Sequence, residues 1–335
     1  MQKVSILIPA YNEEASLQYL FERLIILMNA NDKFVWEVLF VNDGSTDSTL
    51  ILMSQIHEKD PRFNYLDLSR NYGKEIAMLA GFDYLTGDCM IIMDADLQHP
   101  PELIPEMLKY WSEGYDDVYA RRSVRNGESY FKKHTASVFY WFLQKTTKVK
   151  IQQNTGDFRL LDKSCISALR TMRESQRYTK GMYSWIGFNK KEILFEQQER
   201  VAGVSKWNYF KLLELAIEGI TSFTISPLRL SSLIGVMVSL GAFIYMAYIF
   251  IDALMFGDPV RGYPTMMVVI LFLGGSQLLS MGIMGEYLGR IFIETKNRPP
   301  YFARLYNGTK IENLTKEAGN MIPNYSESWK KNTNE

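Results

Sequence analysis

The chain has 335 residues, and at roughly 150 residues per domain this length predicts two structural units. Its hydrophobic content of 47% is that of a folded protein, which excludes a disordered or low-complexity chain. The 37 basic and 37 acidic residues cancel, which argues against a dedicated nucleic-acid binder, and two cysteines are too few for a disulfide scaffold.

Strand-like and helix-like segments alternate through the first 120 residues. Short apolar runs predict strands at Val4–Ile8, Glu37–Val41, Asn64–Leu68, Met90–Met93 and Asp117–Ala120. Helical spacing predicts helices at Glu14–Asn29, Thr46–Glu58, Lys74–Leu85 and Pro101–Ser112, with Ser45 or Asp47 capping the second and Pro100–Pro101 opening the fourth. This alternation predicts an α/β fold with a mostly parallel, doubly wound sheet and flanking helices.

Polar residues follow four of the predicted strands, at the point where each strand ends. These segments are Pro9–Glu14, Asn42–Ser45, Ser69–Glu75 and Asp94–His99. Ligands of doubly wound sheets bind at the carboxyl ends of the strands, so we expect the four segments to form one site. Each segment taken alone could have a purely structural role. Asp43–Gly44, for example, is a common turn.

The pair Asp94 and Asp96 directly follows the fourth predicted strand. Two carboxylates at this spacing can grip one hard cation, and Gln98 adds an amide oxygen. Mg²⁺ or Mn²⁺ suits such oxygen ligands and often completes its shell with substrate phosphates. The pattern therefore predicts a divalent metal at a diphosphate, whereas His99 beside two prolines is expected to be structural.

Two long segments of the C-terminal third, Leu230–Ile251 and Gly262–Gly285, contain no charged residue. A helix needs about 20 apolar residues to span a bilayer. The connection between them is short, so the pattern predicts a transmembrane hairpin with helices at about 230–252 and 262–286. Two buried core helices are the alternative, but the polar residues that follow could not cover them.

Positive charge flanks the hairpin on its outer sides. The basic residues are Lys206, Lys211 and Arg229 before it and Arg290, Lys296, Arg298 and Arg304 after it. The connecting loop holds only Arg261, so both ends are expected to be cytoplasmic in a multi-pass topology. The apolar run at the N-terminus is too short for a signal peptide.

Apolar spacing between Trp207 and Pro227 predicts an amphipathic helix at the membrane interface. The expected organisation is a cytoplasmic catalytic domain at 1–205, an interfacial helix at 206–228, the two transmembrane helices within 229–295 and a cytoplasmic tail at 296–335. Small residues in the second span would allow close helix contact, which leaves a homo-oligomer open.

Residues 121–150 hold eight basic residues and one acid, interleaved with aromatic side chains. This combination suits an anionic lipid headgroup at a membrane surface. A nucleic-acid surface needs the same ingredients, but the adjacent hairpin favours lipid, and no nucleic-acid partner is expected.

Six motifs in chain order resemble those of family 2 glycosyltransferases with the GT-A fold, and over residues 3–300 more closely the polyprenyl-phosphate glycosyltransferases. They are Pro-Ala-Tyr-Asn-Glu-Glu, Val-Asn-Asp-Gly-Ser-Thr-Asp, Leu-Ser-Arg-Asn-Tyr-Gly-Lys-Glu, Asp-Ala-Asp-Leu-Gln-His-Pro-Pro, Gly-Asp-Phe-Arg and Arg-x-x-Gly-x-Ser-Lys-Trp. The resemblance implies a Rossmann-like sheet, and the two-span hairpin favours the bacterial undecaprenyl branch over the mannose synthases.

The resemblance also implies roles for individual residues. The nucleotide-sugar site would comprise Pro9, Tyr11, Glu13, Asp43, Lys74, Asp94, Asp96, Arg200 and Lys206. The metal ligands would be Asp94, Asp96 and Gln98, and the acceptor phosphate would contact Arg122, Lys133 and Ser137. Arg200 would reach the diphosphate from a mobile loop, for which a basic segment touching anionic lipid is the alternative.

Asp157 corresponds to the catalytic acid of the family, and with Asp96 and Arg200 completes the implied catalytic set. Its usual role would be general base. A phosphate monoester has a second pKa of about 6, so a polyprenyl phosphate is already ionised at neutral pH. We therefore expect Asp157 to orient the acceptor or the sugar, with an N-capping Asp as the structural alternative.

These expectations combine into a metal-dependent, inverting hexosyltransferase of the bacterial inner membrane. It would move glucose from UDP-glucose to undecaprenyl phosphate at the cytoplasmic face. GDP-mannose or a modified donor such as UDP-formamido-arabinose is the nearest alternative. A processive synthase is disfavoured because Ser205–Trp207 replaces its Gln-x-x-Arg-Trp motif, and a catalytically idle membrane scaffold or a transferase acting on soluble sugars remains an alternative of another class.

Overall fold

The computed structural model describes residues 1–122, 155–175, 177–195 and 262–311, and scattered positions between 228 and 255. The chain forms two compact units. The first comprises Met1–Gln144, Val149–Tyr209 and Pro299–Glu335, and the second comprises Lys145–Lys148 and Phe210–Arg298.

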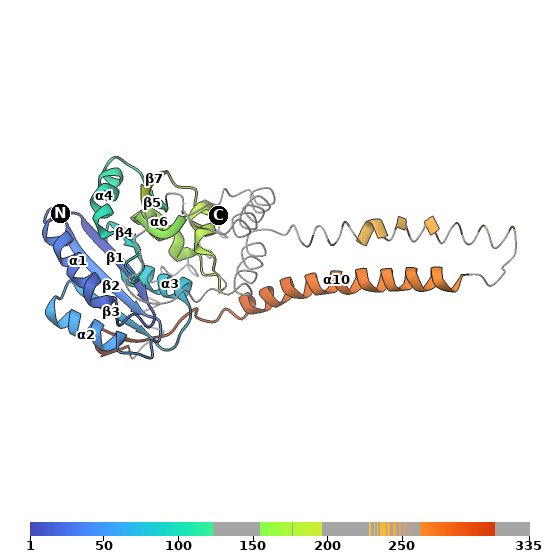
Figure 1. Ribbon diagram of the computed structural model, residues 1–335, viewed down its shortest axis with the longest axis horizontal. Coiled ribbons are helices and arrows are strands. Elements are labelled where there is room, and N and C mark those ends of the chain that lie inside the picture. Colours follow the sequence, from blue (N-terminus) through green and yellow to red (C-terminus); the bar gives the residue numbers. More distant parts are fainter. Residues whose placement is uncertain are drawn as a thin grey trace, which may run out of the picture. The chain divides into compact units, whose positions relative to one another are not determined.

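A nine-stranded sheet is the centre of the first unit in the described part of the chain (Figure 1). The strand order is β7-β5-β6-β4-β1-β2-β3-β8-β9. The strands are β1 (Lys3–Ala10), β2 (Val35–Asn42), β3 (Phe63–Leu68), β4 (Cys89–Ile92), β5 (Asp117–Arg122), β6 (Thr155–Asp162), β7 (Lys190–Phe195), β8 (Ala303–Tyr306) and β9 (Thr309–Lys310). Each of the five predicted strands is confirmed, with ends within two residues of those expected.

The direction of the strands corrects the prediction of a mostly parallel sheet. The four central strands β4, β1, β2 and β3 are parallel, and so is the outer pair β5 and β7. However, β6 runs antiparallel to both β4 and β5, and β8 runs antiparallel to β3 and β9. The sheet is therefore mixed, as is common when strands are added outside a parallel centre.

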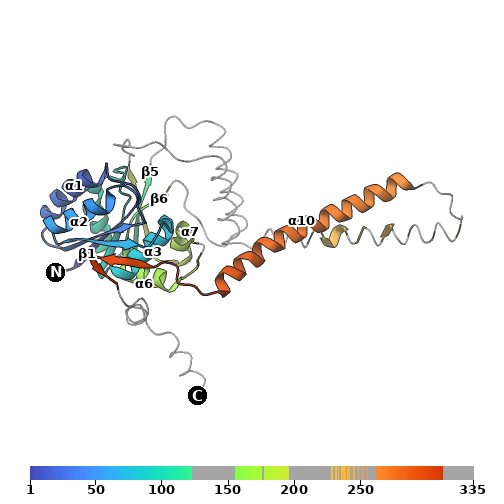
Figure 2. The same ribbon diagram turned by 90° about the horizontal axis from the view of Figure 1, so that it is seen from below.

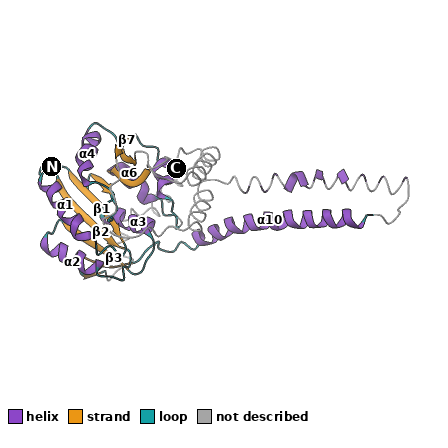
Figure 3. Cartoon of the chain, in the orientation of Figure 1, coloured by secondary structure: helices purple, strands orange, loops and turns teal. Residues whose placement is uncertain are grey.

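The helices cover both faces of this sheet (Figure 3). They are α1 (Leu17–Asn29), α2 (Thr49–Lys59), α3 (Lys74–Tyr84), the 3₁₀ helix η1 (Pro101–Leu103), α4 (Ile104–Ser112), α6 (Lys163–Thr171) and α7 (Thr179–Trp185). Apolar side chains of α1, α2 and α4 share one core with the sheet, while α3 and α6 pack on the opposite face (Figure 2). The four predicted helices are present.

Two helices begin later than the spacing predicted. α1 starts at Leu17 instead of Glu14, and α2 at Thr49 instead of Thr46. Before α2 the backbone N–H of Thr46 donates to Asn12 Oδ1 at 2.8 Å, which ties this segment to the loop after β1. Of the two predicted caps, Asp47 accepts from the N–H of Thr49, whereas the hydroxyl of Ser45 accepts from the N–H of Asn12.

The segment after Arg298 returns to the first unit, although the sequence analysis assigned it to a tail. β8 pairs with β3, and β8 with β9 forms a hairpin at this edge of the sheet, drawn in red in Figure 2. The Tyr301 hydroxyl donates to Asp83 of α3 at 2.7 Å. The first unit is therefore completed by residues that follow the second unit in sequence.

In the second unit the structure describes one long helix, α10 (Tyr263–Thr295). At 1.5 Å per residue a helix of 33 residues is about 50 Å long. Among the described residues, no helix combines the length and the apolar character needed for crossing a membrane. The transmembrane hairpin stays a prediction, and the predicted interfacial helix at 206–228 lies, apart from Leu228, outside the described residues.

Candidate active site

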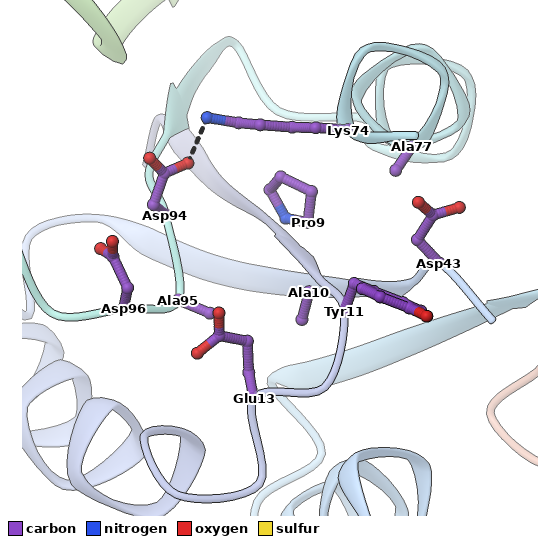
Figure 4. A pocket seen from close by; sticks show the side chains of 10 residues that line it. All are labelled: Pro9, Ala10, Tyr11, Glu13, Asp43, Lys74, Ala77, Asp94, Ala95 and Asp96. Atoms are coloured by element: carbon purple, nitrogen blue, oxygen red, sulfur yellow. Dashed lines mark ion pairs between the residues drawn. The ribbon is translucent and has the colours of Figure 1, made fainter. Parts of the chain in front are cut away.

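A pocket opens at the carboxyl ends of the central strands, where the sequence predicted a site. It is lined by Pro9, Ala10, Tyr11, Glu13, Asp43, Lys74, Ala77, Asp94, Ala95 and Asp96. Figure 4 shows these side chains converging from the ends of β1, β2 and β4 and from the start of α3. Seven of the predicted nucleotide-sugar residues, from Pro9 to Asp96, therefore lie around one cavity.

Two of the strand-end loops are joined by hydrogen bonds. The N–H of Asn12 donates to Ser45 Oγ at 3.0 Å, and the N–H of Glu13 donates to Thr49 Oγ1 at 2.9 Å. Asn12 has a positive φ of 57°, a left-handed conformation that asparagine tolerates better than most residues. These contacts hold the Tyr11–Glu13 turn against the start of α2.

Asp43 is buried at the end of β2 and holds the next loop. Its Oδ1 accepts from the N–H of Tyr72 at 2.7 Å and its Oδ2 from the N–H of Gly73 at 2.9 Å. Burial raises the pKa of Asp43, and the two N–H donors lower it in part. Gly73 has φ 91° and precedes Lys74, so Asp43 fixes the start of α3 as well as lining the pocket.

Lys74 bridges two carboxylates that are distant in sequence. Its Nζ lies 2.5 Å from Asp94 Oδ1 and 2.6 Å from Asp157 Oδ2, and Figure 4 shows the first contact as a dashed line. Burial disfavours the ammonium, but the two acids outweigh it and hold the pKa of Lys74 above its usual value.

The contacts with Lys74 lower the pKa values of the two acids. Burial favours their protonated forms, but the charge of Lys74 outweighs it and holds the pKa values of Asp157 and Asp94 below their usual range. Both carboxyls are therefore ionised at neutral pH.

Asp94 and Asp96 leave β4 with their carboxyls directed toward the pocket (Figure 4). Asp96 Oδ1 accepts from the N–H of Gln98 at 3.1 Å, while the Gln98 side chain is not part of the pocket lining. The intervening Leu97 is buried with φ 60°, a strained conformation of the kind that clusters at functional sites. Two oxygen-bearing acids at an open pocket fit a hard divalent cation.

No group of three or more acidic, histidine or cysteine side chains that could hold a metal is present within the described ranges. The metal site predicted from Asp94, Asp96 and Gln98 thus has two carboxylates in place and stays a prediction.

His99 is buried against Phe158, with ring centroids 5.0 Å apart. Its Nδ1 accepts from the N–H of Asp94 at 3.4 Å, and burial lowers its pKa, so the ring is neutral. This packing agrees with the structural role expected for His99.

The sequence analysis missed a buried layer of polar residues beneath Lys74 and Asp157. Glu75 accepts from the N–H of Thr179 at 3.0 Å and from its hydroxyl, which joins α3 to α7. Burial, and the neighbouring Asp157, raise the pKa of Glu75 to about 8. Glu75 stands in the Asn-Tyr-Gly-Lys-Glu motif, so its position next to Lys74 was the available signal.

Arg159, in the Gly-Asp-Phe-Arg motif, forms the second part of this layer. Its guanidinium lies 3.0 Å from Asp117 and 3.6 Å from the ring centroid of Tyr183. Arg159 is 1% exposed, so it supports β6 from within the core and does not face the pocket.

The remaining predicted site residues are only partly covered. Arg122 is at the end of β5, and its charge is one of the causes, after burial, of the lowered pKa of His99. Lys133, Ser137, Arg200 and Lys206 lie outside the described residues.

Comparison with known proteins identifies the class. Residues 5–170 match the model of glycosyl transferase family 2, and residues 226–291 match that of the GtrB C-terminal hairpin. The chain belongs to glycosyl transferase family 2.

Three curated relatives show the same extent of similarity. An uncharacterized glycosyltransferase of Synechocystis sp. is 44% identical over 89% of this chain and 94% of its own length. The bactoprenol glucosyl transferase of Shigella phage SfX is 42% identical over 90% of this chain and 99% of its own. The prophage bactoprenol glucosyl transferase homolog of Escherichia coli is 41% identical over 90% and 98%. The chain is a glycosyltransferase that aligns with these relatives over nearly their whole length.

Proposed function

We propose that this glycosyltransferase moves glucose from UDP-glucose to undecaprenyl phosphate, with inversion, at the cytoplasmic face of the bacterial inner membrane. The observation that carries the proposal is the pocket in which Asp94 and Asp96 meet Lys74 at the ends of the central strands. A nucleotide-sugar donor needs acids that bind a metal, a positive charge near its phosphates and a loop that contacts its nucleobase. The pocket offers groups of each kind.

Asp94 and Asp96 are the proposed holders of Mg²⁺ or Mn²⁺, since both present carboxylate oxygens to the pocket. A divalent ion supplies charge neutralisation for a departing diphosphate. Lys74 keeps Asp94 ionised and in place, which prepares the acid for a cation. Tyr11, Glu13 and Asp43 also line the pocket and are the proposed contacts of the nucleoside.

Asp157 is proposed to orient and not to take a proton. It lies 2.6 Å from Lys74 Nζ, and that contact holds its pKa below the usual range, which makes it a weak base. The attacking oxygen of a polyprenyl phosphate is already ionised at neutral pH. Attack on the anomeric carbon, opposite the diphosphate, therefore requires alignment and charge stabilisation more than deprotonation.

The acceptor and the membrane are proposed on different grounds. One of the relatives is a bactoprenol glucosyl transferase by name and another is named a homolog of one, and the segment with the two uncharged runs matches the GtrB C-terminal hairpin. The basic, aromatic segment at 121–150, with Arg122 at its start, supports an anionic lipid headgroup as acceptor. Lys133, Ser137, Arg200 and Lys206 keep their proposed roles at the two phosphates.

The test is transfer in detergent from labelled UDP-glucose to undecaprenyl phosphate, with and without Mg²⁺ or Mn²⁺, followed by lipid extraction. We expect metal-dependent label in the organic phase, lost in Asp96→Ala. The matched control is Asp32→Ala, which removes an exposed carboxylate just before β2, at the end of the strand opposite the pocket.

Three other outcomes separate the alternatives. No transfer with UDP binding intact would move the donor to another UDP-sugar, such as UDP-formamido-arabinose. Binding of GDP but not UDP would favour GDP-mannose. Absence of binding to any nucleotide would overturn the proposal and leave the idle scaffold.

A further inference from the structure

The strand β8, which follows the second unit in sequence, places a charged residue against a buried acid of β3. Arg304 donates through Nε to Asp67 Oδ2 at 2.7 Å, and its Nη2 lies 2.7 Å from the same oxygen. The Asp67 side chain is 0% exposed, whereas that of Arg304 is 58% exposed. A buried carboxylate is costly unless it is paired, and Arg304 supplies the charged partner of Asp67 at this position.

Asp67 passes this constraint to the end of β2. Its second oxygen, Oδ1, accepts from Asn42 Nδ2 at 2.8 Å. Asn42 is itself buried and directly precedes Asp43, which lines the pocket. The two carboxylate oxygens of Asp67 therefore have different partners: Oδ2 accepts from Arg304 and Oδ1 accepts from Asn42.

Asn42 continues the connection into both loops of the pocket. Its Oδ1 accepts from the N–H of Ser45 at 3.2 Å, and Ser45 Oγ accepts from the N–H of Asn12 at 3.0 Å. Asn12 stands between Tyr11 and Glu13, which both line the pocket. A series of hydrogen bonds thus runs from Arg304 through Asp67, Asn42 and Ser45 to Asn12, between two of the proposed nucleoside contacts.

We propose that Arg304 is a positioning residue for the nucleotide-sugar donor, and this inference rests on the proposed function. Without the guanidinium, Asp67 loses the partner that holds its side chain in place, and the amide of Asn42 loses an acceptor with a fixed position. The Asn42–Ser45 loop and the Tyr11–Glu13 turn then lose their preset geometry. A pocket that must be ordered at the moment of binding has a lower affinity for its ligand.

The effect should be confined to donor binding. Arg304 is not part of the pocket lining, and Lys74, Asp94 and Asp157 are held together by contacts that do not involve Asp67. We therefore expect a rise in KM for the donor with kcat nearly unchanged, since the catalytic acids keep their places once the donor is bound.

The experiment uses the full chain and measures the dissociation constant of UDP with Mn²⁺ by calorimetry, together with KM and kcat for transfer. Arg304→Met should weaken UDP binding and raise KM by about tenfold, the size of one lost charge-assisted contact. Arg304→Lys should recover part of the loss. Asn42→Ala should produce a similar loss, and the double variant should add little to it.

Arg62→Met is the matched control, because Arg62 also pairs with an aspartate, Asp60 at 2.6 Å, beside β3 but outside this series of hydrogen bonds. It should bind UDP as the wild type does. If Arg304→Met does not fold, Arg304→Lys and Asn42→Ala decide by the same measurement.

The outcomes separate this inference from the proposed function. A wild-type chain that binds neither UDP nor GDP would overturn the proposed function, and the inference with it. A wild type that binds UDP while the Arg304 and Asn42 variants bind it equally well would overturn the inference alone. A fall in kcat with unchanged KM would also overturn it, since that result would place Arg304 in catalysis and not in donor positioning.

Discussion

At the residue scale, the ammonium of Lys74 determines the charge state of the pocket. Replacing Lys74 by Met leaves Asp94 and Asp157 without their shared cation, so their pKa values rise and one of them is expected to protonate. We expect transfer to fall by about 100-fold, the usual size for loss of one preorganised charge contact. Steady-state rates for Lys74→Met, compared with Lys59→Met at an exposed position of α2, measure this. A wild-type rate in Lys74→Met would show that the bridge is not needed.

Glu75 gives a prediction about stability and pH. Its pKa is raised to about 8 by burial and Asp157, so between about pH 4.3 and 8 the folded chain keeps a proton that the unfolded chain releases. Stability from this group is present at low pH and is lost as pH rises toward 8. Glu75→Gln, which mimics the protonated acid, should match the wild type near pH 4.5 and have a higher melting temperature at pH 8. Melting curves that stay parallel across this range would contradict the assignment.

The variant Asp157→Asn tests whether Asp157 acts as an orienting group or as a general base. Because its carboxylate is paired with Lys74 and the acceptor phosphate is already ionised, Asp157→Asn should retain measurable transfer, reduced by about 10- to 100-fold. Its pH profile between 6.5 and 8.5 should keep the wild-type shape. Complete loss at every pH, in a variant that still binds UDP, would identify Asp157 as the base.

The sequence predicted which residues meet at the pocket but not how they pair. Asp43, Asp94 and Lys74 each follow a strand, and parallel strands bring their ends together. The Lys74–Asp157 contact depends on the place of β6 in the sheet, which no local pattern encodes. Arg304 was read only as a positive charge near the membrane, because its partner lies 237 residues away.

At the element scale, alternating apolar runs were sufficient for the five strands between Lys3 and Arg122, since a buried strand and an amphipathic helix have different periods. The apolar pattern of the sequence does not encode the direction of a strand relative to its neighbours. β6, β7, β8 and β9 were not predicted, and the two short C-terminal strands carry exposed polar residues that resemble a loop.

The contact between α3 and β1 depends on a glycine and is open to a direct test. A Cβ at Gly81 would lie 2.1 Å from Leu7 Cδ1, and Leu7 is fully buried. Gly81→Ala should therefore destabilise the chain by about 1–3 kcal/mol, the usual cost of overpacking, as measured by urea unfolding. Leu7→Ala in the same chain should remove the clash, so the double variant should be more stable than the sum of the two single changes predicts. Additive effects would show that the helix simply shifts to make room.

At the scale of the whole molecule, the catalytic unit is discontinuous in sequence. The chain leaves it for α10 and returns at Pro299 to add β8 and β9 to the edge of the sheet. This return covers the edge of β3, whose exposed backbone groups would otherwise be open to pairing with other chains. Side-chain contacts also fix it, among them those from Tyr301 to Asp83, from Arg304 to Asp67 and from Asn307 to Asn64.

Removal of this segment tests whether the catalytic unit needs residues beyond the second unit. A chain ending at Arg298 loses β8 and β9, exposes the edge of β3 and leaves Asp67 buried without Arg304. The loss of two strands and of the charged partner of a buried acid should remove a large part of the stability of the domain. We expect this chain to aggregate or to lose UDP binding, measured by size-exclusion chromatography and calorimetry. A chain ending at Ile311 keeps both strands and should bind UDP as the full chain does. Equal binding by the two truncated chains would mean that the first 298 residues form the catalytic unit without the returning strands.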